Sequence, residues 1–88
     1  MPPQVTVYGA DWCFYTREAV RYLNELGVSY RYVDTDTDTA ASQWVKDHND
    51  GLELKPTLDV GGVVLSAPTA SQLESTLREA GLLPARAA

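Results

Sequence analysis

A strand, a helix and a second strand follow one another closely at the start of the chain. Apolar and polar residues alternate over Gln4–Tyr8, a pattern that predicts a strand. From about Phe14 to Leu26 the apolar residues recur along one helical stripe, and Gly27 is placed to end that helix. Val28–Val33 is rich in aromatic and β-branched residues, which favours a second strand. A connection this short predicts a right-handed parallel crossover.

The middle of the chain predicts a turn and a second helix. Asp and Thr alternate over 34–39, and their short side chains suit a turn and an N-cap for a helix over 40–49. The carboxylates of this run lack the glycine and closing glutamate of a cation-binding loop, so we interpret them as a solvated helix cap. His48 shares a helical face with Trp44, which indicates packing and not a metal ligand. A catalytic base role for His48 is not favoured.

The last third predicts a hairpin and a third helix. Two apolar segments, 57–60 and 63–65, flank Gly61–Gly62, and paired glycines accept the positive φ angles of a tight hairpin turn. Thr69 and the glutamine three residues later resemble a capping box for a helix that ends at Gly81. The order β-α-β-α-β-β-α therefore predicts an α/β fold, a four-stranded mixed sheet flanked by helices.

Length and charge restrict the domain organisation and the partners. The chain has 88 residues, enough for one compact domain over 1–88 with an ordered core at about 4–82. Its net charge of −5 disfavours nucleic acid and anionic membranes as partners. The sequence contains neither an apolar run long enough to span a bilayer nor a signal-peptide pattern, so the expected compartment is the cytoplasm.

The single cysteine of the chain, Cys13, lies where the first strand gives way to the first helix. One cysteine forms no intramolecular disulfide and no cysteine-rich metal site. A helix N-terminus offers unpaired N–H groups and the positive end of the helix dipole, which stabilise a thiolate. The position therefore predicts an accessible, reactive thiolate and not a buried side chain.

The residues around Cys13 suggest further site functions. The Thr16 hydroxyl, one helical turn away, either donates a hydrogen bond to the thiolate or caps the helix locally. Trp12, Phe14 and Tyr15 form an aromatic cluster that a loop-to-helix junction cannot bury completely. We expect one or two of these rings to be an exposed apolar rim that contacts the substrate, with Phe14 the exposed one.

Several short motifs recur in a known family of small proteins. They are Trp12 before the helix, the run Cys13-Phe14-Tyr15-Thr16, the run Lys55-Pro56-Thr57 and the Gly61–Gly62 hairpin. Together they resemble the glutaredoxin family, and most of all its short mycoredoxin and ribonucleotide-reductase hydrogen-donor branch. The resemblance extends from about Val5 to Leu77. The family motif carries Cys or Ser where Thr16 stands, so the resemblance implies a monothiol route. No cofactor is tightly bound in such a route, and a small thiol such as glutathione, mycothiol or bacillithiol is the co-substrate that resolves the mixed disulfide.

The resemblance also implies substrate-binding residues. It implies a cis peptide bond before Pro56, with neighbouring backbone groups that bind the thiol substrate. The Lys55 ammonium either lowers the Cys13 pKa, holds a substrate carboxylate or is simply solvated. Pro68 and Thr69 lie where relatives bind the γ-glutamyl carboxylate of glutathione, although plain helix capping fits them equally well. The lysine that many glutathione-using members carry before the cysteine is replaced here by Ala10-Asp11.

The sequence thus predicts a monothiol thiol–disulfide oxidoreductase, a monomer acting on small thiols and protein mixed disulfides. Two alternatives stay open. One is an iron–sulfur carrier, in which two subunits each supply Cys13 and two small thiols complete the ligands. The other is a binding module that kept the fold and lost redox turnover.

Overall fold

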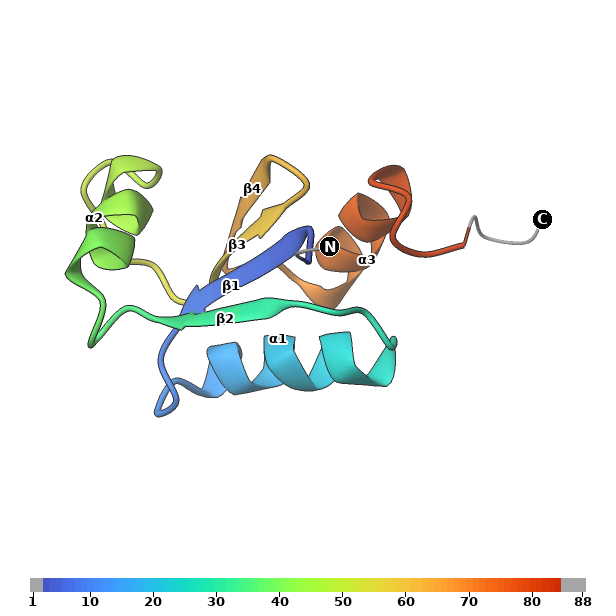
Figure 1. The fold of residues 1–88 in the computed structure, drawn as a ribbon, viewed down its shortest axis with the longest axis horizontal. Coiled ribbons are helices and arrows are strands. Elements are labelled where there is room, and N and C mark those ends of the chain that lie inside the picture. Colours follow the sequence, from blue (N-terminus) through green and yellow to red (C-terminus); the bar gives the residue numbers. More distant parts are fainter. Residues whose placement is uncertain (1–2, 85–88) are drawn as a thin grey trace.

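A single mixed sheet organises the described part of the chain. The computed structural model describes residues 3–84. Its four strands lie in the order β2-β1-β3-β4, with β1 and β2 parallel and the other neighbouring pairs antiparallel (Figure 1). The α/β fold and the element order predicted from the sequence are confirmed. The elements are β1 (Val5–Gly9), α1 (Phe14–Glu25), β2 (Arg31–Asp34), α2 (Thr39–Asp47), β3 (Thr57–Val60), β4 (Val63–Ser66) and α3 (Ala70–Glu79).

The second strand is shorter than predicted, because its expected first residues close the preceding helix. The Val28 N–H donates to the Leu23 carbonyl at 3.0 Å, and the Gly27 N–H donates to the Asn24 carbonyl at 3.1 Å. These two bonds form the Schellman arrangement that ends many helices, with Gly27 at a φ of 70°. Val28 is buried in the core but belongs to the helix end, and pairing in β2 begins only at Arg31.

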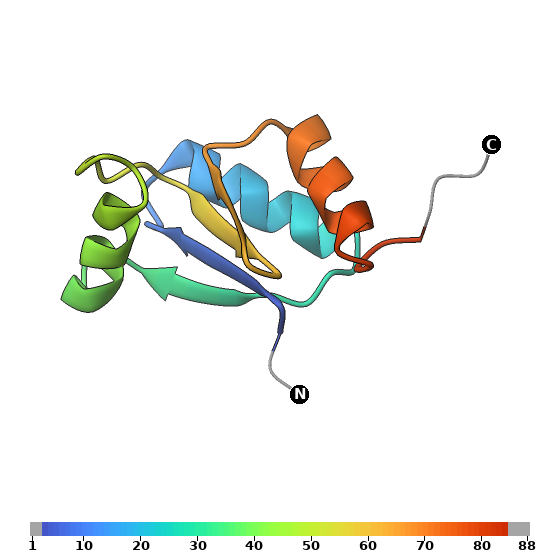
Figure 2. The same ribbon diagram turned by 90° about the horizontal axis from the view of Figure 1, so that it is seen from above.

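The two faces of the sheet are covered differently. Helices α1 and α3 lie together on one face, as Figure 2 shows. Helix α2 packs through Trp44 against Tyr8 of β1, whose rings stack at 4.4 Å. Tyr8 alternates in β1 with the buried Val5 and Val7, so α2 covers the face opposite α1 and α3. The main core cluster comprises Val5, Val7, Leu23, Val28, Leu58, Val60, Leu73 and Leu77.

Side-chain oxygens begin two of the helices. The Asp38 carboxylate accepts a hydrogen bond from the Ala41 N–H at 2.9 Å, so the Asp–Thr run caps α2 as predicted, although α2 starts and ends slightly earlier than expected. Thr69 and Gln72 form the complete capping box predicted for α3. Within residues 3–84 no group of three or more His, Cys, Asp or Glu side chains is arranged to hold a metal. None of the helices in this part of the chain has the length and apolar character needed to cross a bilayer.

Candidate functional site

Cys13 is the N-cap residue of α1, at the junction where the sequence places it. Its backbone is extended, with φ −81° and ψ 120°. Its N–H donates to the Ala10 carbonyl at 3.0 Å, and its carbonyl accepts the Arg17 N–H at 3.1 Å. The loop and the first turn of the helix therefore hold the residue from both sides.

The Cys13 side chain is far more covered than the sequence predicts. It is 9% exposed, and Sγ lies 4.0 Å from the Lys55 carbonyl oxygen. The prediction of an accessible thiol is therefore wrong for most of the side chain's surface, because the segment Lys55–Pro56 lies against the sulfur. The peptide bond between Lys55 and Pro56 is cis, as the resemblance implies.

Polar neighbours counter the effect of this burial on the thiol. Burial raises the pKa of Cys13. The Thr16 hydroxyl, the backbone N–H groups of Thr16 and Tyr15 and the Lys55 ammonium lower it, and the net pKa lies below that of an ordinary thiol. The sulfur is thus buried in a setting that favours its ionised form.

Thr16 links the thiol to the end of the first strand. Its side chain is fully buried, and its Oγ1 accepts a hydrogen bond from the Ala10 N–H at 3.4 Å. A Cβ atom added at Gly9 would lie 2.4 Å from Cγ2 and 2.5 Å from Oγ1 of Thr16. Gly9 therefore lets β1 approach the first turn of α1 closely enough to keep the Thr16 hydroxyl beside the sulfur.

We expect Thr16→Val to raise the pKa of Cys13, because valine keeps the shape and removes the hydroxyl. Alkylation by iodoacetamide at pH 7 should then slow by roughly three- to tenfold. In the unchanged protein the alkylation rate rises with pH through a midpoint below that of a free thiol and then levels off. Thr16→Ser, which keeps the hydroxyl, is the matched control. A midpoint that does not move in Thr16→Val would show that the hydroxyl leaves the thiol unaffected.

All three aromatic residues around the cysteine are exposed, and not only one or two as predicted. Trp12, Phe14 and Tyr15 are 67%, 58% and 68% exposed. Phe14 is exposed as expected and meets the Tyr15 ring edge-on at 5.5 Å. Trp12 is held outward because its indole N–H donates to the Asp36 carboxylate at 2.6 Å. The apolar rim is therefore larger than the sequence suggests.

Most of the predicted substrate-binding residues line one groove. It has a volume of about 410 Å³ and runs between the start of α1 and the start of α3. Trp12 and Lys55 do not line it; they lie together, with the Lys55 ammonium 5.6 Å from the centre of the Trp12 ring. The predicted residues on its walls are Phe14, Tyr15, Pro56, Pro68 and Thr69.

The capping interpretation of Thr69 is the one that the structure shows. Its hydroxyl accepts the Gln72 N–H at 3.1 Å, and its own N–H donates to the Gln72 side chain at 2.9 Å. The Thr69 N–H is therefore already paired, and of the groups in the capping box only the Thr69 hydroxyl proton can still donate to a carboxylate in this groove.

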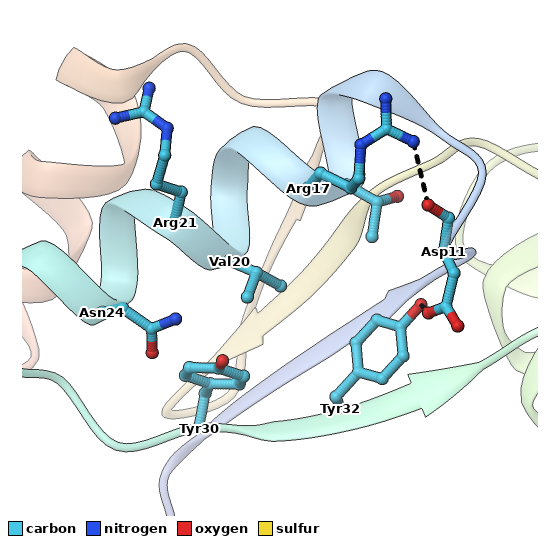
Figure 3. A pocket seen from close by; sticks show the side chains of 8 residues that line it. Asp11, Arg17, Val20, Arg21, Asn24, Tyr30 and Tyr32 are labelled. Atoms are coloured by element: carbon cyan, nitrogen blue, oxygen red, sulfur yellow. Dashed lines mark hydrogen bonds between the residues drawn. The ribbon is translucent and has the colours of Figure 1, made fainter.

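A second groove lies on the other side of α1, against β2 (Figure 3). Two of the side chains that line it hold the loop before Cys13 in place. The Tyr32 hydroxyl donates to the Asp11 carboxylate at 2.7 Å, and the Arg17 guanidinium donates to the Asp11 carbonyl at 3.0 Å. Burial and the Asp11 carboxylate raise the pKa of Tyr32, so its hydroxyl stays protonated and able to donate. Sequence reasoning missed this attachment, because no local pattern connects Asp11, in the loop after β1, with a tyrosine in β2.

The fold and the site together define a class. A four-stranded mixed sheet that brings a cis-proline against a cysteine at the first helix N-terminus is the arrangement of a thioredoxin-fold thiol protein. Residues 5–65 match the glutaredoxin family. The chain therefore belongs to the glutaredoxin family of thioredoxin-fold oxidoreductases.

Individual relatives agree with this assignment. Mycoredoxin 1 of Corynebacterium glutamicum is 43% identical over 54 residues, which are 61% of this chain and 66% of that protein. The match thus spans slightly less than two thirds of that relative. The structure of oxidized glutaredoxin 2 from Chlamydomonas reinhardtii superposes with a TM-score of 0.71 at 28% identity, over 92% of this chain and 85% of that one. A buckwheat glutaredoxin–glutathione complex, 19% identical, shares the fold with a TM-score of 0.70 over 93% and 83% of the two chains.

Proposed function

We propose that the protein is a monothiol thiol–disulfide oxidoreductase of glutaredoxin type, with Cys13 as the nucleophile and Thr16 stabilising its thiolate. The observation that carries the proposal is the position of Cys13 at the start of α1, where its sulfur faces the Lys55 carbonyl beside cis-Pro56, and the neighbouring Thr16 hydroxyl and Lys55 ammonium lower its pKa. A thiolate is the form that attacks disulfides. In this proposal the chain forms a single domain, and the protein acts as a monomer in the cytoplasm.

The reaction has two exchange steps. The Cys13 thiolate attacks the small-thiol sulfur of a protein mixed disulfide; a new sulfur–sulfur bond forms at Cys13, and the protein thiolate leaves and takes a proton from water. A second small thiolate then attacks the sulfur of the small thiol attached to Cys13, which releases the Cys13 thiolate and a symmetric disulfide. The incoming small thiol is oxidised and the protein sulfur of the mixed disulfide is reduced to a thiol, while the first small thiol stays at the disulfide level throughout. The cycle needs no second protein cysteine, and the chain has none.

The groove beside Pro56 is the proposed place of the small thiol. Phe14, Tyr15, Pro56 and Pro68 offer it apolar walls. Outside the groove, the Lys55 carbonyl faces the Cys13 sulfur and the Lys55 ammonium faces the Trp12 ring. The name of mycoredoxin 1 and the glutathione bound in the buckwheat structure support a low-molecular-weight thiol as co-substrate. Glutathione, mycothiol and bacillithiol are the candidates.

Exposure to these candidates in competition tests the proposal. The protein is mixed with oxidised glutathione, mycothiol disulfide and bacillithiol disulfide, and the adduct is identified by mass spectrometry. We expect one small thiol per chain, attached to Cys13, and its release as symmetric disulfide when the same reduced thiol is added. An adduct that forms and is never released would instead select a binding module without turnover. The absence of any adduct would overturn the proposal.

A further inference from the structure

We infer that the site selects mixed disulfides whose small-thiol part carries no net negative charge, and that Glu53 is the residue that sets this preference by neutralising Lys55. The inference rests on the proposed function and names the substrate class of the same site.

The pairing of Lys55 is the first observation. The Lys55 ammonium lies 3.4 Å from the Glu53 carboxylate, and the two side chains are only 12% and 28% exposed. The ammonium also faces the Trp12 ring, which limits the directions in which it can extend. Lys55 is the cation whose charge acts on Cys13. A substrate carboxylate that approached it would have to compete with a carboxylate already in place.

Glu53 stays ionised beside Lys55. Burial raises the pKa of Glu53, but the nearby Ser42 and Thr35 hydroxyls and the charge of Lys55 bring it below the ordinary value. Glu53 is therefore a carboxylate at neutral pH, and the structure places it against the Lys55 ammonium.

The described walls of the groove offer no unpaired cation of their own. Among the described residues on its walls the one cation is Arg21, whose guanidinium is bound by Glu18 and by Glu25, each at 2.6 Å. Arg17, the next cation along α1, donates to the Asp11 carbonyl and faces the second groove across the helix (Figure 3). Among the described residues around the groove and the sulfur, these cations are thus already paired when a substrate carboxylate approaches.

The test compares disulfides that differ only in charge. One neutral cysteine peptide is converted to its mixed disulfides with glutathione, whose carboxylates outnumber its ammonium, with neutral mercaptoethanol and with cationic cysteamine. The second-order rate of small-thiol transfer to Cys13 is measured for each at low salt by quenched-flow mass spectrometry. Two charges roughly 7 Å apart near a protein surface change such a rate by about three- to tenfold, so we expect cysteamine transfer to exceed glutathione transfer by about that factor.

Glu53→Gln keeps the hydrogen-bond acceptor and removes the charge. We expect it to shift the ratio of glutathione to cysteamine rates by about three- to tenfold in favour of glutathione. Any change in the pKa of Cys13 affects both substrates equally and cancels in the ratio. Glu79→Gln, which alters the net charge by the same amount at the exposed end of α3, is the matched control and should leave the ratio unchanged.

A double variant separates the proposed cause from other effects. In Glu53→Gln with Lys55→Met the freed ammonium is gone, so the ratio should return to within about twofold of the unchanged protein. A ratio that stays constant in Glu53→Gln, or that moves equally in Glu79→Gln, would overturn the inference while leaving the proposed function intact. Failure of all three disulfides to transfer a thiol to Cys13 would overturn the proposed function and this inference with it.

Discussion

The Cys13→Ser variant is expected to lose turnover of small-thiol mixed disulfides by at least about 1,000-fold. A serine hydroxyl does not ionise at neutral pH and cannot form the sulfur–sulfur bond of the first exchange step. No other thiol in the chain can take over, because Cys13 is its one cysteine. The measurement is steady-state release of a reporter peptide from its mixed disulfide in the presence of excess reduced small thiol.

Two controls make this result interpretable. The far-ultraviolet circular dichroism of Cys13→Ser should match that of the unchanged protein, since serine is itself a good N-cap residue. Thr16→Val should keep measurable turnover, because it alters the ionisation of the nucleophile and leaves the sulfur in place. Turnover above roughly a hundredth of the original in Cys13→Ser would mean that the sulfur is not the group that reacts.

Gly9→Ala is expected to produce the largest loss of stability, about 3 kcal/mol, or a decrease in Tm of roughly 15 °C. The added methyl would lie 2.4 Å and 2.5 Å from two Thr16 side-chain atoms, inside the closest contact that packed atoms allow. Both residues are buried, so β1 and α1 must separate or Thr16 must turn away from Cys13. Thermal unfolding measures the first effect, and slower alkylation of Cys13 at pH 7 reports the second.

Gly27→Ala is the matched control for this substitution. Gly27 has a φ of 70° and no atom within 4 Å of an added Cβ, so alanine there costs only the backbone strain, about 1–2 kcal/mol. Combining Gly9→Ala with Thr16→Ala should recover part of the loss, because the two closest atoms are removed. A Gly9→Ala protein as stable as Gly27→Ala would contradict the close approach between β1 and α1.

The fold could be predicted largely because its signals are local. Gly27 and Gly81 end helices at the positions where the periodicity stops, and Thr69 and Gln72 mark the start of the last helix within four residues. The start of β2 was misplaced for a related reason. An apolar residue after a helix-ending glycine, such as Val28, packs back on that helix, and its side chain alone does not distinguish this from the first residue of a strand.

Residue patterns alone predict the site only where it depends on neighbours in the chain, whereas the distant Pro56, Pro68 and Thr69 were predicted through the family resemblance. The position of Cys13 at a strand–helix junction is local, so it was predicted correctly. Its burial is not local, because Lys55 comes from the other half of the chain. Asp36 likewise turns Trp12 outward, and Glu53 neutralises Lys55, through side chains that no spacing in the sequence connects to the cysteine.

The start of α1 has a consequence for the covalent adduct. Helices α2 and α3 are capped by side-chain oxygens, whereas the Cys13 side chain makes no capping hydrogen bond to the first turn of α1. The amides there gain an anionic neighbour only while the sulfur is charged, and both protonation and attachment of a small thiol discharge it. In the proposed cycle, attachment of a small thiol therefore removes a favourable charge from the start of the helix, and the same stabilisation of the thiolate makes Cys13 a good leaving group in the second exchange step.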